Sequence, residues 1–216
     1  MEKDFSLKIS ALIWDLDGTL LDSYGVIVSS LYKTCRELGI PADEQEILRE
    51  VITHSVGAFI SKTEKETGIS SGIIKQRQSE ISDSEKLNIM PIRHAAEILS
   101  LMEKRGIRNF VFTHRGTSTD IILKNTGLYE FFEEIITGKD GFPRKPDPAA
   151  VLYLIRKYDL DKEKTFYVGD RTLDVECAVN AGIGSILYLP ENSAAMPDGK
   201  ETYIVKDLLE IGDIIS

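Results

Sequence analysis

The stretch LIWDLDGTLLD, residues 12–22, decides the fold because three aspartates follow an apolar run. The run over residues 8–14 predicts a strand buried on both faces. Asp15, Asp17 and Asp22 come at its end. Since a buried carboxylate without a partner is costly, acids in this position indicate a cation, a proton partner or solvent beside them.

The chain after Pro91 alternates between helical and extended patterns, and this predicts an α/β fold. Repeated alternation favours a mostly parallel sheet with helices on both faces and right-handed crossovers. The end of the chain, residues 203–216, predicts a last edge strand and a helix. Helices are expected over residues 91–106, 118–127, 147–160 and 172–182, and strands over 107–113, 131–137, 165–170 and 184–189.

The segment between the first strand and this series has helical spacing and no convincing strand. Helices are expected there with breaks at residues 39–41, Gly57 and Gly68. The predicted organisation is an α/β core of residues 1–20 and 86–216, interrupted by an all-helical insert of residues 21–85. An insert of about 65 residues has the size of a small domain.

The composition limits the possible partners. The formal net charge of −9 argues against binding to nucleic acid or to an anionic membrane, because both need clustered Lys and Arg. The chain shows neither an apolar signal segment nor a stretch of ~20 apolar residues, so a cytoplasmic protein is expected. Cys35 and Cys177 have no metal-site spacing and are expected to be reduced thiols. A monomer and a homodimer both remain open.

The ends of the predicted strands carry the polar residues that bear on function. In open parallel sheets, ligands bind outside the carboxyl ends of the strands. Each strand end that can be placed carries a side chain able to bind phosphate or metal. These residues are Asp15, Asp17 and Thr19 after the first strand, Thr113 and His114 after the second, Lys145 after the third, and Asp170 and Asp174 after the fourth.

The residue types at these positions suit phosphoryl transfer. Asp15 and Asp17 are two residues apart in an extended segment, so one can attack a phosphorus atom while the other exchanges a proton. A divalent cation relieves the repulsion between carboxylate and phosphate, and Asp170 supplies a further ligand for it. Ligation by oxygen alone points to Mg²⁺. Lys145 would neutralise the phosphoryl oxygens, and the Thr113 hydroxyl would donate a hydrogen bond to them.

Four short motifs, in this order, resemble those of the haloacid dehalogenase-like (HAD) superfamily, in its phosphoglycolate-phosphatase-like branch. They are DLDGTLLDS (15–23), Thr113, RKPDP (144–148) and VGDRTLD (168–174), and they span nearly the whole chain. The resemblance implies a Rossmann-like, doubly wound core with a helical cap inserted after the first motif. It also implies a phosphatase that acts through an aspartyl-phosphate and requires Mg²⁺.

The resemblance assigns roles to the acidic residues. It implies that Asp15 is the nucleophile and a metal ligand. Asp17 protonates the leaving alkoxide, then activates water, and reaches Mg²⁺ through its backbone carbonyl. Asp170 ligates the metal, and Asp174 orients the groups that do.

The remaining expectations concern the phosphoryl group and two departures from the family pattern. Thr19, Thr113, His114 and Lys145 are expected to contact the substrate, although many relatives carry Asn where this chain has His114. Arg171 replaces a small Ser or Thr and removes a possible local helix cap. Arg115 is expected to be a surface cation, and Asp22 a turn or helix-cap acid where the chain leaves for the insert.

The function that the sequence supports best is hydrolysis of a small phosphorylated metabolite. One alternative is a phosphomutase that passes the same phosphoryl group to a sugar. A second alternative is a sensor that binds a phosphorylated ligand without turnover. The identity of the substrate depends on the insert and its loops, and one sequence does not assign those contacts.

Overall fold

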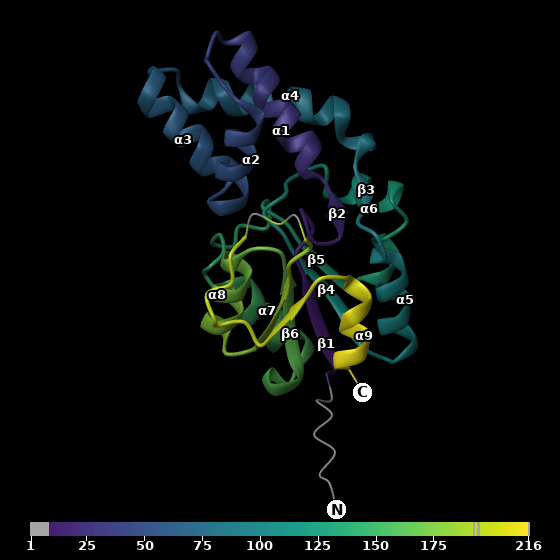
Figure 1. Cartoon of the computed structure of the whole chain (residues 1–216). Helices are drawn as coiled ribbons and strands as arrows, with labels where there is room; N and C mark the ends of the chain where they lie inside the picture. The colour runs from purple at the N-terminus through teal and green to yellow at the C-terminus, as the bar shows by residue number, and fades with distance from the viewer. Residues whose placement is uncertain (1–8, 192, 194, 216) are drawn as a thin grey trace, which may run out of the picture. The chain divides into compact units, whose positions relative to one another are not determined.

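The computed structural model describes residues 9–191, 193 and 195–215, and the chain forms two compact units (Figure 1). Unit 1 comprises Met1–Leu21 and Pro91–Ser216, and unit 2 comprises Asp22–Met90. The two chain connections between the units, β2 (Leu21–Asp22) and β3 (Met90–Pro91), pair in a two-stranded sheet.

Unit 1 contains a six-stranded sheet in the order β5-β4-β1-β6-β7-β8. All its strand pairs are parallel, and Trp14 of β1 lies opposite Val111 of β4 and Val168 of β6. Neighbouring strands therefore end together at one edge. The strands are β1 (Ala11–Trp14), β4 (Arg108–Phe112), β5 (Glu134–Ile136), β6 (Thr165–Gly169), β7 (Gly184–Tyr188) and β8 (Tyr203–Val205).

Helices cover both faces of this sheet, which confirms the predicted doubly wound α/β architecture. Figure 1 shows α7 and α8 on one face and α5 and α9 on the other. Ile13, Phe110 and Tyr167 of the sheet pack with Val151 of α7 and Ala178 of α8. The helices are α5 (Ala95–Lys104), α6 (Thr119–Asn125), α7 (Ala149–Tyr158), α8 (Thr172–Ala181) and α9 (Ile211–Ile214), with 3-10 helices at Tyr129–Phe131, Lys162–Lys164 and Leu208–Glu210.

Unit 2 is helical and has an apolar core of its own. The side chains of Leu31, Ile47, Ile60 and Ile74 are buried together in it. No helix in the described ranges is both long enough and apolar enough to cross a membrane. The helices are α1 (Tyr24–Glu37), α2 (Glu44–Thr53), α3 (Val56–Thr67) and α4 (Ser71–Glu85), followed by a 3-10 helix at Lys86–Asn88.

The predicted break between two helices at Gly57 is present but lies earlier, between Thr53 and Val56. Gly57 lies in the first turn of α3, which begins one residue after Ser55. The Ser55 hydroxyl accepts the N–H of Ala58 at 3.0 Å and caps the helix. A side-chain cap therefore sets this boundary, and the glycine, where the break was predicted, does not.

Several other helix and strand ends also differ from the prediction. Pro91 lies in β3, and α5 starts only at Ala95. Ser118 precedes α6 without a capping hydrogen bond from its side chain. Asp22 is exposed in β2 and does not cap α1, which follows Ser23. The first strand begins at Ala11, and the predicted start at Lys8 lies outside the described residues.

Candidate active site

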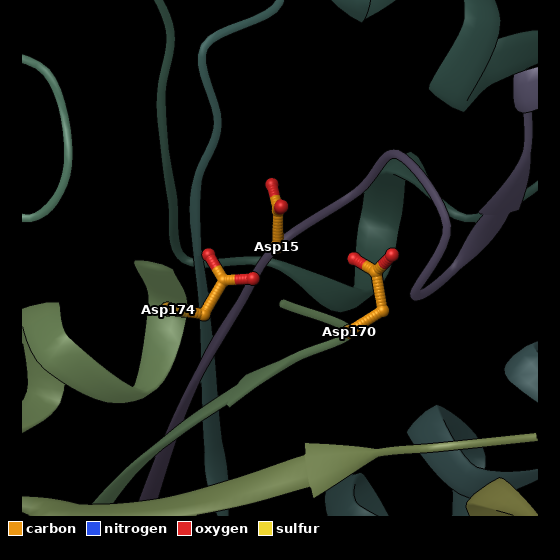
Figure 2. A group of neighbouring side chains, drawn as sticks. All are labelled: Asp15, Asp170 and Asp174. Carbon is orange, nitrogen blue, oxygen red and sulfur yellow. The ribbon is translucent and has the colours of Figure 1, made fainter. Parts of the chain in front are cut away.

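Three predicted acidic residues meet at the carboxyl edge of the sheet (Figure 2). Asp15 follows β1, Asp170 follows β6, and Asp174 lies in the first turn of α8. Each offers a carboxylate oxygen, and the three atoms lie within 4.8 Å of one another. All three residues are at most 5% exposed. The chain thus concentrates negative charge in a place that is nearly closed to water.

The local backbone explains why these acids converge. The N–H of Asp15 donates to the Val168 carbonyl at 2.9 Å, which extends the pairing of β1 with β6 by one residue. At Gly169 a Cβ atom would overlap the Asp174 side chain, so glycine allows α8 to approach the end of β6. The first turn of α8 therefore delivers Asp174 beside Asp15.

A buried ammonium group lies among the carboxylates. Nζ of Lys145 is 3.0 Å from Oδ2 of Asp15 and 2.7 Å from Oδ1 of Asp174. It also donates to the Tyr167 hydroxyl at 3.0 Å, and that hydroxyl donates to the Phe112 carbonyl at 2.6 Å. The Lys145 side chain is 0% exposed. All three ammonium donors thus have partners, as a buried cation requires.

The pKa values reflect competition between burial and charge. Burial raises the pKa of Asp15, but Lys145 and Arg171 outweigh it and hold that pKa below its ordinary value. Burial lowers the pKa of Lys145, but Asp15 and Asp174 outweigh it and raise that pKa. For Asp174 burial prevails and the pKa is raised. Asp15 is therefore ionised, and Lys145 is charged.

Arg171 contributes a second cation, and its side chain makes no capping hydrogen bond to α8, as expected. Its Nη2 lies 3.4 Å from Oδ2 of Asp15, and its side chain is 11% exposed. The N–H of Arg171 donates to Oδ2 of Asp174 at 3.2 Å. The Asp174 carboxylate thus satisfies the N–H of the residue that precedes α8, whereas a Ser or Thr side chain at position 171 would accept an N–H within the first turn.

The other predicted site residues also have partners within unit 1. Thr19 donates its hydroxyl to Oδ1 of Asp170 at 3.2 Å. Thr113 is 1% exposed, and its hydroxyl accepts the N–H of Arg115 at 3.2 Å. Nε2 of His114 accepts the N–H of Lys145 at 2.7 Å. His114 thus holds the backbone of Lys145.

The charge state of His114 follows from its surroundings. Burial, followed by the charges of Lys145, Arg144 and Arg171, lowers the pKa of His114 to about 2. The ring is therefore neutral at ordinary pH, which leaves Nε2 free to accept the backbone hydrogen bond. A protonated ring would lose this bond.

The expectation that Arg115 is a surface cation is wrong. Its side chain is 8% exposed, and its guanidinium pairs with the Asp17 carboxylate. The Asp17 carboxylate therefore contacts Arg115 and is not part of the cluster of three acids. This pair and the contact of Tyr167 with Lys145 could not be predicted, because local sequence patterns do not indicate which side chains meet across separate strands and loops.

The three clustered acids fit a magnesium ion. All donors are carboxylate oxygens, which suit hard cations such as Mg²⁺. The cluster brings three buried carboxylates within 4.8 Å of one another, and Lys145 pairs with Asp15 and Asp174. A divalent cation would compensate that charge.

A parallel α/β sheet with aspartates and a buried lysine at its carboxyl edge is typical of enzymes that act on anionic groups. A family model described as haloacid dehalogenase-like hydrolase matches residues 12–188, so the chain belongs to that family. The expected hydrolase of the HAD superfamily, in its phosphoglycolate-phosphatase-like branch, is thereby confirmed.

Named relatives agree with this family, and a solved structure shares the fold. The chain is 27% identical over 188 residues to a phosphoglycolate phosphatase of Thiobacillus denitrificans, covering 83% of each chain. It is 26% identical over 212 residues to the pyrophosphatase PpaX of Oceanobacillus iheyensis, covering 97% of this chain and 98% of the relative. The structure of a predicted phosphoglycolate phosphatase of Haemophilus somnus superposes with a TM-score of 0.82 at 22% identity, covering 95% and 97% of the two chains.

Proposed function

We propose that this protein is a Mg²⁺-dependent phosphatase that hydrolyses a small phosphomonoester through an aspartyl-phosphate on Asp15. The observation that carries the proposal is the buried Lys145 ammonium between Asp15 and Asp174. It keeps a carboxylate ionised at a strand end and supplies positive charge for a phosphoryl group. Membership of a hydrolase family and the phosphatase names of the relatives support the same conclusion.

In the first half-reaction, a carboxylate oxygen of Asp15 bonds to phosphorus as the bond from phosphorus to the leaving oxygen breaks. The leaving oxygen takes the electron pair and receives a proton from Asp17. Lys145 and the hydroxyl of Thr113 stabilise the negative charge on the phosphoryl oxygens. The products of this half-reaction are an alcohol and the aspartyl-phosphate.

In the second half-reaction, the Asp17 carboxylate takes a proton from water as the water oxygen bonds to phosphorus. The bond between phosphorus and Asp15 breaks, which restores the Asp15 carboxylate and releases inorganic phosphate. Asp15, Asp170 and the backbone carbonyl of Asp17 would hold Mg²⁺, and Asp174 and Thr19 would orient these ligands. When bound, Mg²⁺ reduces repulsion between the nucleophile and the phosphate.

We also propose that residues 21–85 act as the cap of this enzyme and that residues 1–20 and 86–216 form its catalytic core. The helical unit is inserted directly after the first motif, between Asp22 and Met90. In this position it would select for small substrates by limiting access to the phosphate site.

The proposal is tested with p-nitrophenyl phosphate and a panel of small phosphomonoesters. The wild-type protein is expected to release phosphate with Mg²⁺ and to stop when EDTA removes the metal. Asp15→Asn is the control that keeps the shape of the side chain but not its charge. After rapid acid quench, mass spectrometry is expected to find a phosphoryl group on the wild-type peptide that contains Asp15. Turnover equal to that of Asp15→Asn on every compound would refute the proposal.

A further inference from the structure

The contact between Arg115 and Asp17 has a one-sided geometry. Nε of Arg115 donates to Oδ1 of Asp17 at 3.0 Å, and Nη2 contacts the same oxygen. The side chains are 8% and 21% exposed, respectively. Among the described residues, Oδ2 of Asp17 makes no hydrogen bond or ion pair. The guanidinium thus occupies one carboxylate oxygen and leaves the other available.

The backbone that carries Arg115 is anchored. Its N–H donates to the Thr113 hydroxyl at 3.2 Å, and its carbonyl accepts the N–H of Gly138 at 2.8 Å. A Cβ atom at Gly138 would lie 2.7 Å from the carbonyl oxygen of His114, so this close approach requires glycine. The loops after β4 and β5 are therefore held together where Arg115 emerges.

The backbone that carries Asp17 is held as well. Asp17 pairs with Leu21 in an isolated bridge, and the N–H of Gly18 donates to the Leu21 carbonyl at 2.9 Å. Gly18 has a φ of 82°, which closes this tight turn. An ion pair between two anchored and largely buried groups fixes an orientation, whereas an exposed pair contributes little.

We propose that Arg115 is a positioning residue for Asp17, holding Oδ1 so that Oδ2 is the oxygen that exchanges protons with the leaving group and with water. This inference rests on the proposed phosphatase function. In the first half-reaction the Oδ2–H bond breaks, and its proton goes to the leaving oxygen. In the second half-reaction Oδ2 accepts a proton from water. Arg115 touches no reacting atom and acts through Asp17.

The inference predicts a dependence on the leaving group. Nitrophenolate is a weak base and leaves without much protonation, whereas the alkoxide of β-glycerophosphate needs a proton. General acid catalysis contributes about 100-fold or more where it is needed. The value of kcat/KM reports only the steps up to release of the leaving group, so it isolates the donation of this proton.

The test compares kcat/KM for β-glycerophosphate and p-nitrophenyl phosphate in wild type, Arg115→Gln and Asp17→Asn. Arg115→Gln is expected to lose about 10- to 100-fold on β-glycerophosphate and less than about threefold on p-nitrophenyl phosphate. Asp17→Asn is expected to show the same selectivity. The double variant is expected to lose no more than Asp17→Asn, because both changes affect one step.

The control is Arg156→Gln, the same substitution at an exposed position of α7, which is expected to alter neither substrate. An equal loss on both substrates would mean that Arg115 only supports the fold, and would overturn the inference. So would unchanged kinetics, or an effect confined to KM. A wild-type protein without turnover of p-nitrophenyl phosphate would refute the proposed function itself. A wild type that is active, with an unselective Arg115→Gln, would refute only the role of Arg115.

Discussion

Lys145 is the residue on which the charge balance of the site depends most. Replacing Lys145 with Met removes the ammonium group that contacts the buried carboxylates of both Asp15 and Asp174. We expect kcat/KM to fall at least about 100-fold, because phosphoryl charge loses its stabilisation. We expect the free energy of unfolding to fall by about 3–5 kcal/mol, as when one partner of a buried ion pair is removed. Phosphatase assays and urea denaturation measure these two effects.

A second variant separates the two effects of Lys145. Lys145→Met combined with Asp174→Asn removes one of the uncompensated carboxylates. Its stability is expected to recover in part, while its activity stays low. Recovery of activity in the double variant would contradict the role of the ammonium group in stabilising phosphoryl charge.

The lowered pKa of His114 predicts that the free energy of unfolding decreases as the pH falls. Its pKa in the folded protein is about 2, and the ordinary value is 6.5. Below pH 6.5 the unfolded chain binds a proton that the folded chain does not. The stabilisation is therefore complete above pH 6.5 and is lost as the pH falls, by up to about 1.4 kcal/mol per pH unit. Urea unfolding of the wild-type protein from pH 8 to pH 5 measures this slope.

His114→Asn is the control for this pH dependence. The amide oxygen of Asn still accepts a hydrogen bond but has no titration in this range. We expect the stability difference between wild type and variant to shrink as the pH falls from 6.5 to 5. A difference that stays constant with pH would show that His114 does not titrate as its burial requires.

The sequence predicts the residues of the site better than their partners. The spacing of acids after strands predicts that Asp15 and Asp170 meet, because parallel strands end at a common edge. The pairing of Arg115 with Asp17, and of His114 with the Lys145 backbone, depends on side-chain orientation and on loops that approach through Gly138. Such contacts arise from tertiary packing, which local patterns do not record.

At the scale of the elements, Gly169 links the end of β6 to α8. A methyl group at this position would overlap Asp174, so Gly169→Ala is expected to displace the first turn of α8. Overpacking of this kind costs about 1–3 kcal/mol. We expect that loss of stability together with a loss of phosphatase activity, because Asp174 contacts Lys145. Thermal unfolding and kcat/KM on p-nitrophenyl phosphate test both.

Gly57→Ala in α3 is the matched control for Gly169→Ala. A Cβ atom there would lie 3.7 Å from the Ser55 hydroxyl oxygen, which is ordinary contact. Alanine in a helix is favoured over glycine by about 0.5–1 kcal/mol, so this variant is expected to be more stable than wild type. Destabilisation by Gly57→Ala would show that the helix does not pass through this residue as described.

Gly57 and Gly68 show why element boundaries were harder to predict than element types. The apolar periodicity predicts the strands and most of the helices because a buried face has a fixed repeat. Glycine ends a helix at Gly68, where φ is 75°, but lies within a helix at Gly57. The difference depends on the Ser55 cap and on φ, and the residue type alone specifies neither.

At the scale of the whole molecule, two apolar clusters of the described residues belong to different units. One lies in unit 1 between the sheet and the helices α7 and α8, and the other joins the four helices of unit 2. Each unit thus buries its own apolar residues. The predicted insertion of a helical segment into an α/β core depends on this separation.

The separation predicts that unit 1 folds without unit 2. The connecting segments pair as β2 and β3, so Leu21 and Pro91 are close enough for a short glycine-rich linker to replace residues 22–90. We expect the shortened protein to unfold in one cooperative transition, because the sheet and its helices keep their contacts.

We also expect the shortened protein to keep turnover of p-nitrophenyl phosphate, since Asp15, Lys145 and Asp170 all belong to unit 1. If the helical segment limits access, the ratio of kcat/KM for large to small phosphomonoesters will be higher for the shortened protein than for the full chain. A shortened protein that folds and discriminates between substrates as the full chain does would contradict a role of residues 21–85 as a cap.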